Sequence, residues 1–304
     1  MCQPSITSIL VAAARALGAR DRDPQVRNPD WLAERLVGPE ERALLGPFDA
    51  LLERSFEQNI EVTIARLLIP RTHFIDARLK TAIGEGIAQL VILGAGFDTR
   101  PYRFSEMLKD VRVFEVDHPD TQQVKIRRVR EAIGEPPTNV AYVAVDLRTA
   151  ELGEALTRAG YEAARKTFFI WEGVTMYLPA EAVQATVTWI ASNAARESAI
   201  VFDYTYETPI KLMRDFDVDK LPESAKQAAM RFRSLMSGEP WIFGLPDKAE
   251  KEFLNSLGLE LRTVLGMNSR EAVEKYLTRA DGTIFGTYPA TEQQGYMILE
   301  AVVP

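Results

Sequence analysis

Residues 90–100 read Leu-Val-Ile-Leu-Gly-Ala-Gly-Phe-Asp-Thr-Arg, and this stretch decides the fold class. The apolar residues at its start predict a buried strand, which runs directly into Gly94 and Gly96. Because glycine has no Cβ, it adopts positive φ readily and lets a ligand approach the main chain closely. The polar residues before Pro101 predict a helix start, whose free N–H groups face such a ligand. The combination is typical of a nucleotide-type site, and a tight turn without a ligand is the alternative.

The rest of the chain from about residue 88 alternates between short apolar runs and helical stretches. The predicted strands are 89–93, 111–116, 140–145, 167–171, 199–202, 259–264 and 295–302, and the predicted helices between or beside them are 119–133, 150–165, 179–195 and 247–257. Most of these strands are apolar throughout, which is typical of strands buried on both faces of a parallel sheet. The alternation therefore predicts a doubly wound α/β fold.

We expect a single domain over residues 1–304. Residues 1–83 read as an N-terminal helical cap, residues 84–204 as the ligand-binding core, and residues 205–304 as cap insertions followed by the last strands of the sheet.

Composition narrows the class of protein. The chain has 304 residues and a net charge of −7, with no basic block, which argues against nucleic-acid and membrane partners. Its single cysteine, Cys2, and its two histidines, His73 and His118, are too few for a structural metal site. No apolar run is long enough to span a membrane, and no signal-peptide layout is evident, so we expect a cytoplasmic protein. The sequence leaves the oligomeric state open.

Acidic residues follow three further predicted strands. Asp117 lies about twenty residues beyond the glycines, where an acid accepts the ribose hydroxyls of a bound nucleotide, and its position favours it over Glu115. Asp146 lies where it can reach an adenine amino group, and Glu172 lies where cofactor and substrate would meet. Each acid alone reads equally as a helix cap. Together they indicate an adenosine-containing ligand.

The glycine pattern distinguishes between two such ligands. A dinucleotide-binding loop would carry a third glycine where this chain has Thr99. S-adenosylmethionine (SAM) has no pyrophosphate and does not require that glycine. Its methionine carboxylate requires a cation, for which Arg71 and Arg100 are the nearest candidates. SAM is therefore favoured over NAD.

Several motifs in the same order resemble the leucine carboxyl methyltransferase family, and within it a bacterial branch of SAM-dependent O-methyltransferases, some of them linked to polyketide pathways. The motifs are residues 94–100, 114–119, 145–147, 171–178, 202–204 and 238–241. The resemblance covers nearly the whole chain. It implies a class I SAM-dependent methyltransferase fold, Rossmann-like, with a mainly parallel seven-stranded sheet, an antiparallel last strand and a helical cap.

The resemblance also implies site residues. By position Arg71 matches the family arginine that holds the methionine carboxylate, Asp146 and Leu147 match the adenine contacts, and Glu172 matches the acid near the methionine amino group. The predicted cofactor-binding residues are Arg71, Gly94, Ala95, Gly96, Asp98, Arg100, Asp117, His118, Asp146, Leu147, Glu172 and Gly173. Thr7-Ser8 stands where eukaryotic members have a Ser-Lys pair, so their protein-tail substrate does not transfer directly.

The expected reaction is methyl transfer from SAM to a carboxylate or hydroxyl oxygen of a small molecule, such as a natural-product intermediate. The alternatives are a carboxyl methyltransferase acting on a protein C-terminus and a SAM-binding protein without catalytic activity. The catalytic candidates are His73, Glu172 and Tyr204, and the substrate-binding candidates are Tyr177, Tyr204, Tyr206 and Trp241. Structural packing is the alternative for His73 and for the aromatic residues. No compelling base stands out, which favours a carboxylate or phenol acceptor.

Overall fold

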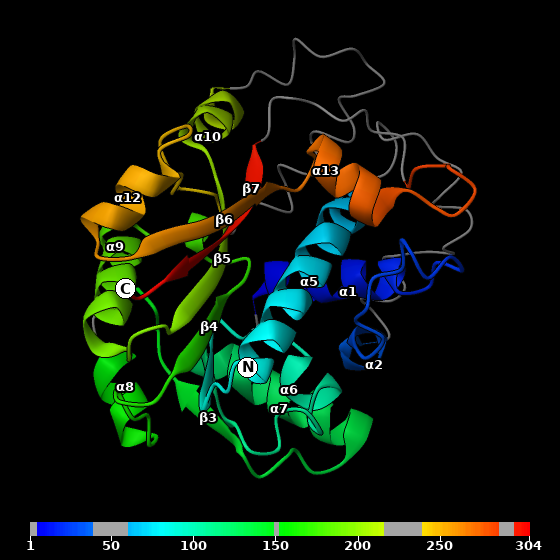
Figure 1. Ribbon diagram of the computed structural model, residues 1–304. Coiled ribbons are helices and arrows are strands. Elements are labelled where there is room, and N and C mark those ends of the chain that lie inside the picture. The colour runs from blue at the N-terminus through cyan, green and yellow to red at the C-terminus, as the bar shows by residue number, and fades with distance from the viewer. Residues whose placement is uncertain (1–4, 39–59, 149–151, 216–238, 286–294) are drawn as a thin grey trace.

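The fold is built on one seven-stranded sheet, seen in a computed structural model that describes residues 5–38, 60–148, 152–215, 239–285 and 295–304 (Figure 1). The strands are β1 (Gln89–Leu93), β2 (Arg112–Asp117), β3 (Val140–Ala144), β4 (Thr167–Trp171), β5 (Ala199–Thr205), β6 (Glu260–Gly266) and β7 (Tyr296–Val302). Each predicted strand is present, with ends shifted by at most a few residues. The sequence pattern therefore located every strand of the sheet.

The strand order is β3-β2-β1-β4-β5-β7-β6. Strands β1 to β5 pair in parallel, whereas β7 is antiparallel to both β5 and β6. The prediction of a mainly parallel sheet with an antiparallel last strand is confirmed. Because the order reverses between β1 and β4, the carboxyl ends of these two strands flank the position where ligands bind in such folds.

Helices cover the sheet on both faces (Figure 1). The described helices are α1 (Ile6–Gly18), α2 (Ala33–Leu36), α5 (Ile60–Gly84), α6 (Arg100–Arg103), α7 (Pro119–Ile133), α8 (Leu152–Arg158), η2 (Thr175–Tyr177), α9 (Ala180–Asn193), α10 (Glu207–Arg214), α12 (Glu250–Ser256), α13 (Arg270–Ala272) and the π-helical η4 (Val273–Leu277). One apolar core lies between the sheet and α5, and a second lies between the sheet and α8, α9 and α12. Strands β1, β4 and β5 are buried along their whole length, as their apolar sequences predict.

One predicted helix is shorter than its sequence pattern. The helix expected over residues 150–165 ends at Arg158, and residues 149–151 lie outside the described residues. Gly160 follows with φ +94°, its N–H bonds the carbonyl of Thr157, and Tyr161 N–H bonds the carbonyl of Leu156 at 2.9 Å. This is a glycine-terminated helix end, so the backbone turns away before the apolar pattern stops.

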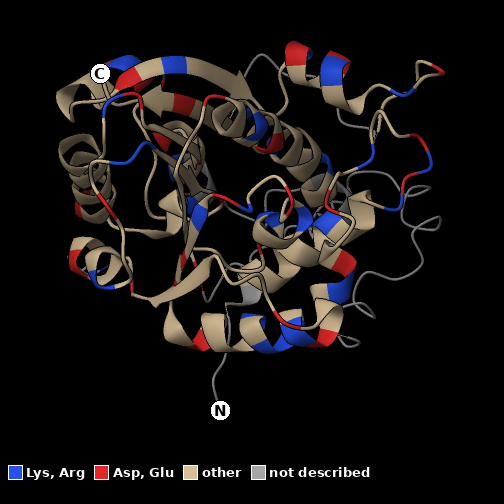
Figure 2. Cartoon of the chain, turned by 60° about the horizontal axis from the view of Figure 1, so that its bottom comes forward, with Lys and Arg blue, Asp and Glu red and all other residues tan. Residues whose placement is uncertain are grey.

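Helices α1 and α5 pack against each other, and α5 also contacts β4 and β5. At the end of α1, a Cβ added to Gly18 would lie 3.4 Å from Ile69 Cγ1, so the two helices approach closely there. Acidic and basic residues are interspersed over the helices (Figure 2). In the part of the chain that the structure describes, no helix is both long and apolar enough to cross a membrane.

The division of the chain into cap, core and insertions stays a prediction. Parts of the proposed cap, residues 39–59, 216–238 and 286–294, lie outside the described residues.

Candidate active site

A cavity of about 770 Å³ opens at the carboxyl ends of β1, β2 and β4, beneath helix α1. Its lining residues are Ser5, Thr7, Ser8, Val11, Arg15, Arg71, Ile92, Gly94, Ala95, Gly96, Phe97, Asp98, Asp117, His118, Thr121, Val145, Asp146, Leu147, Arg148, Glu172, Gly173, Val174, Tyr177, Leu178, Glu239, Pro240 and Ile242. All predicted cofactor-binding residues except Arg100 are in this set. The cavity therefore lies at the position that the sequence predicts for the cofactor.

The glycine turn forms the floor of the cavity. Gly94 has φ +63°, and a Cβ there would lie 2.4 Å from a methyl group of Val174, so only glycine fits. The N–H of Gly96 donates a hydrogen bond to the carboxylate of Asp117, and the N–H of His118 donates to the same carboxylate at 2.6 Å. Burial raises the pKa of Asp117, although these two hydrogen bonds oppose the shift. Asp117 thus fixes the turn and lines the cavity.

The competing acid on the same strand lies elsewhere. Glu115 is fully buried, forms a 2.8 Å ion pair with Lys125 and accepts a hydrogen bond from the hydroxyl of Tyr102 at 2.9 Å. It does not line the cavity. The sequence-based preference for Asp117 over Glu115 agrees with this arrangement.

The far wall of the cavity follows β3. Asp146 is half-buried and pairs with Arg148 at 2.6 Å, and the hydrogen bonds from Arg148 lower the pKa of Asp146. Leu147 beside it is buried and apolar. His118 is exposed on the cavity rim, where its ring accepts a hydrogen bond from Asp120 N–H at the start of α7. An acid beside an apolar wall suits a flat ring with a polar edge.

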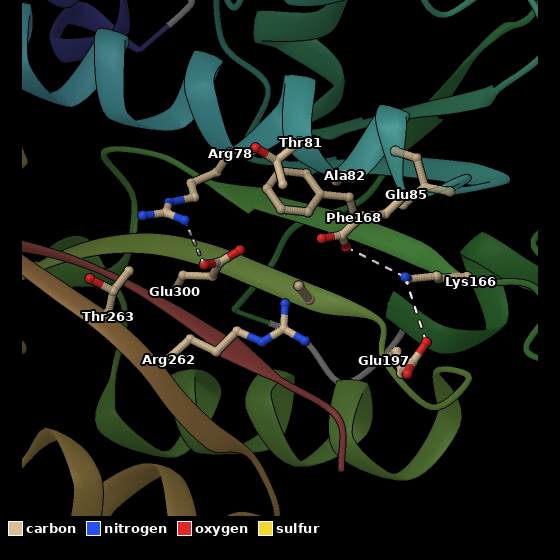
Figure 3. A pocket seen from close by; sticks show the side chains of 12 residues that line it. Arg78, Thr81, Ala82, Glu85, Lys166, Phe168, Glu197, Arg262, Thr263 and Glu300 are labelled. Atoms are coloured by element: carbon tan, nitrogen blue, oxygen red, sulfur yellow. Dashed lines mark ion pairs between the residues drawn. The ribbon is translucent and has the colours of Figure 1, made fainter.

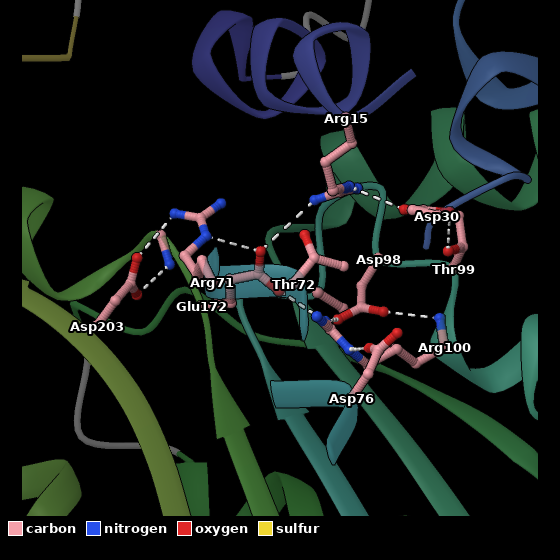
Figure 4. A network of polar contacts seen from close by, with 12 residues as sticks. Arg15, Asp30, Arg71, Thr72, Asp76, Asp98, Thr99, Arg100, Glu172 and Asp203 are labelled. Carbon is pink, nitrogen blue, oxygen red and sulfur yellow. Dashed lines mark hydrogen bonds and ion pairs between the residues drawn. The ribbon is translucent and has the colours of Figure 1, made fainter. Parts of the chain in front are cut away.

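The opposite wall holds Glu172, which follows β4 at the centre of a buried charge network (Figure 4). Its carboxylate lies 2.9 Å from Arg71 Nε, 2.6 Å from Arg100 Nη1 and 3.7 Å from Arg15 Nη1. Burial opposes ionisation of Glu172, but the three arginine charges outweigh burial and hold the pKa of Glu172 well below its usual range. Glu172 is therefore a carboxylate anion at neutral pH.

Arg71 lies on α5 directly after Pro70 and reaches into the cavity wall. Its Nη1 donates to Asp203 at 2.7 Å and to the hydroxyl of Tyr296 at 2.6 Å. Its Nη2 is buried and has no hydrogen-bond partner among the described residues. Guanidinium N–H groups pair readily with carboxylates, so a free, buried N–H at a cavity wall fits the carboxylate of a ligand.

Arg100, the second predicted cation for that carboxylate, does not fit this role. Its side chain is 2% exposed and does not line the cavity. It lies 2.7 Å from Asp76, 2.5 Å from Asp98 and 2.6 Å from Glu172. The start of α6 directs it beneath the glycine turn, so it neutralises internal acids instead of facing the ligand.

Arg15 is a lining residue that the sequence reasoning missed. Its Nη2 donates to the carbonyl of Phe97 at 2.7 Å, and its Nε lies 2.8 Å from Asp30. Arg15 is 5% exposed and lies among the buried alanines of α1. The sequence did contain a signal for Arg15, which is a single charged residue on the apolar face of an amphipathic helix. A charge in that position is buried on folding and must pair with an opposite charge.

Three aromatic or histidine candidates lie away from the cavity. His73 stacks on Tyr276 with 5.4 Å between ring centroids and contacts the carbonyl of Arg27 at 3.0 Å. It stands two residues after Arg71 on a helix, a rotation of about 200° that turns it to the opposite face. Tyr204 and Tyr206 are buried, and both hydroxyls donate to Glu250, at 2.6 and 2.5 Å.

The β-strand alternation accounts for the two tyrosines. Successive side chains of β5 point to opposite faces, so Asp203 faces Arg71 while Tyr204 packs toward α12. The catalytic role considered for His73 and Tyr204, and the substrate role considered for Tyr204 and Tyr206, do not match their positions. None of the three lines the cavity.

The remaining substrate candidates lie at or beside the cavity. Tyr177 lines it, and burial raises the pKa of this tyrosine, which keeps its hydroxyl protonated. Trp241 does not line the cavity but stacks on Tyr296 at 6.0 Å, between the lining residues Pro240 and Ile242. Glu239 joins this segment to the start of α1 by accepting hydrogen bonds from Ser5 and Thr7.

A smaller cavity of about 390 Å³ lies at the opposite ends of the strands (Figure 3). Most of its charged side chains pair with one another: Lys166 lies 3.6 Å from Glu85 and 3.7 Å from Glu197, and Arg78 lies 3.6 Å from Glu300. It contains neither the glycine turn nor the acids that follow β2, β3 and β4. Among the described residues no group of three or more His, Cys, Asp or Glu residues could hold a metal ion, and Cys2 lies outside those residues.

Two solved structures are similar to this one over nearly its whole length. A "putative methyltransferase" from Thermobifida fusca has a TM-score of 0.54 at 16% identity and covers 96% of this chain and 94% of its own. A DUF574 family protein from Streptomyces avermitilis has a TM-score of 0.55 at 15% identity and covers 96% and 97%. With the strand order above, they show the class I SAM-dependent methyltransferase fold.

The sequence comparisons show the family. The family model of leucine carboxyl methyltransferase matches residues 8–191. A relative from Frankia alni, named a "putative S-adenosyl-L-methionine-dependent methyltransferase", is 31% identical over 80% of this chain and 82% of its own length. A relative of the same description from Mycolicibacterium gilvum is 34% identical, and the match spans 65% of each chain. The cofactor of the protein is SAM, and the chain belongs to the leucine carboxyl methyltransferase family.

Proposed function

We propose that the protein is a SAM-dependent methyltransferase and that it transfers the methyl group to an oxygen atom, the carboxylate or hydroxyl of a small molecule. The observation that carries the proposal is the cavity at the carboxyl ends of β1, β2 and β4. It combines the glycine turn, an acid after each of three strands and an unpaired guanidinium N–H of Arg71.

We assign the cofactor contacts from these positions. Asp117 accepts the ribose hydroxyls, Asp146 and Leu147 contact the adenine edge and face, and Arg71 Nη2 pairs with the methionine carboxylate. Glu172 stands next to Arg71 and balances the ammonium group. The missing Cβ of Gly94 leaves room for Val174, and the turn formed by Gly94 and Gly96 lines the cavity beside the ligand.

SAM supplies an electrophilic methyl group, and transfer is an in-line displacement by the acceptor oxygen. The protein aligns the acceptor and excludes water. Helix α1 and the segment around Glu239 line the cavity and are joined by the hydrogen bonds from Ser5 and Thr7 to Glu239. A carboxylate acceptor is already ionised near neutral pH and needs no base. Tyr177 stays protonated and so donates a hydrogen bond to the acceptor instead of removing its proton.

Labelled SAM tests the proposal. The protein is incubated with SAM carrying a labelled methyl group and a panel of carboxylic acids and phenols, and transfer is followed by label in the organic product. A methyl ester releases its label as methanol in alkali, whereas a methyl ether keeps it, so one treatment separates the two acceptor classes. A polyketide-type acid or phenol tests the natural-product expectation in the same panel.

Variants tie the result to the site. Asp117→Asn keeps the shape of the side chain but removes its charge, and we expect the affinity for SAM to fall about tenfold. Asp120→Asn, three residues on at the exposed start of α7, is the matched control and should leave affinity unchanged. SAM binding with no transfer to any acceptor, or transfer only to a peptide C-terminus, would contradict the proposed small-molecule reaction.

A further inference from the structure

The buried charges beside the cavity do not balance. Four arginines and five carboxylates form one network, with every side chain at most 6% exposed (Figure 4). The arginines are Arg15, Arg71, Arg100 and Arg103, and the acids are Asp30, Asp76, Asp98, Glu172 and Asp203. One carboxylate charge is left without a matching arginine among the described residues.

Two acids of the network contact a single arginine. Asp30, Asp76 and Glu172 each contact two or more arginines, whereas Asp98 contacts only Arg100 and Asp203 on β5 contacts only Arg71. Its other donors are neutral. The N–H of Gly173 donates to Asp203 at 2.5 Å, and the hydroxyl of Tyr296 donates to it as well.

These contacts place Asp203 directly behind the cavity wall. Both Arg71 and Gly173, which Asp203 holds, line the cavity, and Asp203 itself is 0% exposed. Three donors, one of them cationic, surround the carboxylate of Asp203. Because the side chain is fully buried, water screens its charge less than it would at the surface.

The neighbouring charges do not cancel this charge. Glu115 is paired with Lys125 at 2.8 Å, and Asp146 with Arg148 at 2.6 Å. The carboxylates of Asp117 and Glu239 also line the cavity and add negative charge. The described walls therefore suit a ligand of net positive charge.

The methyl reaction changes the charge of the cofactor. SAM carries a sulfonium and an ammonium against one carboxylate. When the acceptor oxygen takes the methyl group, the electron pair of the S–C bond returns to sulfur, and the product S-adenosylhomocysteine (SAH) is neutral overall. We propose that the unmatched buried charge of this network, which includes Asp203 behind the cavity wall, makes the site bind cationic SAM more tightly than neutral SAH, and so favours release of the product. The inference rests on SAM as the cofactor of the proposed function.

Calorimetry on the purified full chain tests this inference. The dissociation constants of SAM, SAH and sinefungin are measured at one ionic strength, since sinefungin carries an ammonium group in place of the S-methyl. We expect wild-type protein to bind SAM and sinefungin more tightly than SAH. In Asp203→Asn the ratio of the SAH and SAM constants should fall by about tenfold toward unity. Tyr296→Phe removes a neutral donor to the same carboxylate and should leave the ratio unchanged.

The ratio separates charge selection from structural support, because a merely structural loss weakens SAM and SAH equally. An equal loss in Asp203→Asn, or a wild-type site that binds SAH as tightly as SAM, would overturn the inference. If Asp203→Asn does not fold, Asp76→Asn removes one charge from the same network without altering the cavity lining, and its ratio should also fall. Wild-type protein that binds none of the three ligands would overturn the cofactor assignment, and with it this inference.

Discussion

Some side chains in this protein both stabilise the fold through contacts with other residues and line the cavity. Arg71 contacts Glu172 and Asp203 with two of its nitrogens and leaves the third free at the cavity wall. Asp117 fixes the glycine turn through Gly96 and faces the cavity at the same time. Stability and binding are therefore coupled at these residues, and a variant must be measured for both.

Glu172 predicts how stability depends on pH. Its folded-state pKa lies below the unfolded value of 4.5, so its contribution is fully present above that pH and is lost as the pH falls through the folded pKa. Glu172→Gln should cost about 3 kcal/mol of unfolding free energy at pH 7, because it leaves three arginine charges less compensated. It should also flatten the loss of stability below about pH 5.

Urea unfolding at a series of pH values measures this. Glu131→Gln is the control, since Glu131 is 68% exposed and makes only a 4.0 Å pair with Arg127. A Glu172→Gln profile parallel to that of the wild type would show that Glu172 is not the group responsible for acid sensitivity.

At the level of elements, the turn after β1 sets the geometry of the site. The turn is tied to β2 by the N–H of Ala95, which bonds the carbonyl of Val116 at 2.9 Å. Helix α1 also lines the cavity, and Glu239 ties its first turn to the segment before α12. The site is thus assembled from elements far apart in the chain.

Gly94→Ala tests the role of the turn. Its Cβ would lie 2.4 Å from Val174 in a backbone with positive φ, so we expect a loss of about 2 kcal/mol in stability and a weaker affinity for SAM. Gly84→Ala at the end of α5 meets no atom within 4 Å and should change stability by less than about 1 kcal/mol. Chemical unfolding and calorimetry measure both effects. Equal behaviour of the two variants would contradict the steric argument.

At the scale of the whole molecule, ligand binding should stabilise the fold. SAM at a hundred times its dissociation constant adds about 2.7 kcal/mol to the free energy of unfolding, which raises Tm by about 5 °C in a protein of this size. NAD should produce no shift, because the turn lacks the third glycine and carries Thr99 instead. Differential scanning calorimetry with each ligand distinguishes them. A shift with NAD and none with SAM would contradict the cofactor assignment.

The sequence by itself determined the strands, the glycine turn and the acids after β2, β3 and β4. These are local features, since apolar runs, glycine positions and strand ends depend on neighbours within a few residues. Parallel strands bring their carboxyl ends to one edge of the sheet. The strand assignments alone therefore predicted that Asp117, Asp146 and Glu172 lie together at that edge, where all three line the cavity.

For the other candidate residues, only the tertiary structure decided whether the side chain points into the cavity or into the core. Arg15 meets Glu172 across 157 positions of sequence, and Arg100 is drawn into the core by Asp76. Tyr204 faces α12 because Asp203, its neighbour on β5, faces Arg71. Buried charges must find partners wherever the packed elements offer them, and that choice is set by contacts distant in the chain, which local periodicity does not encode.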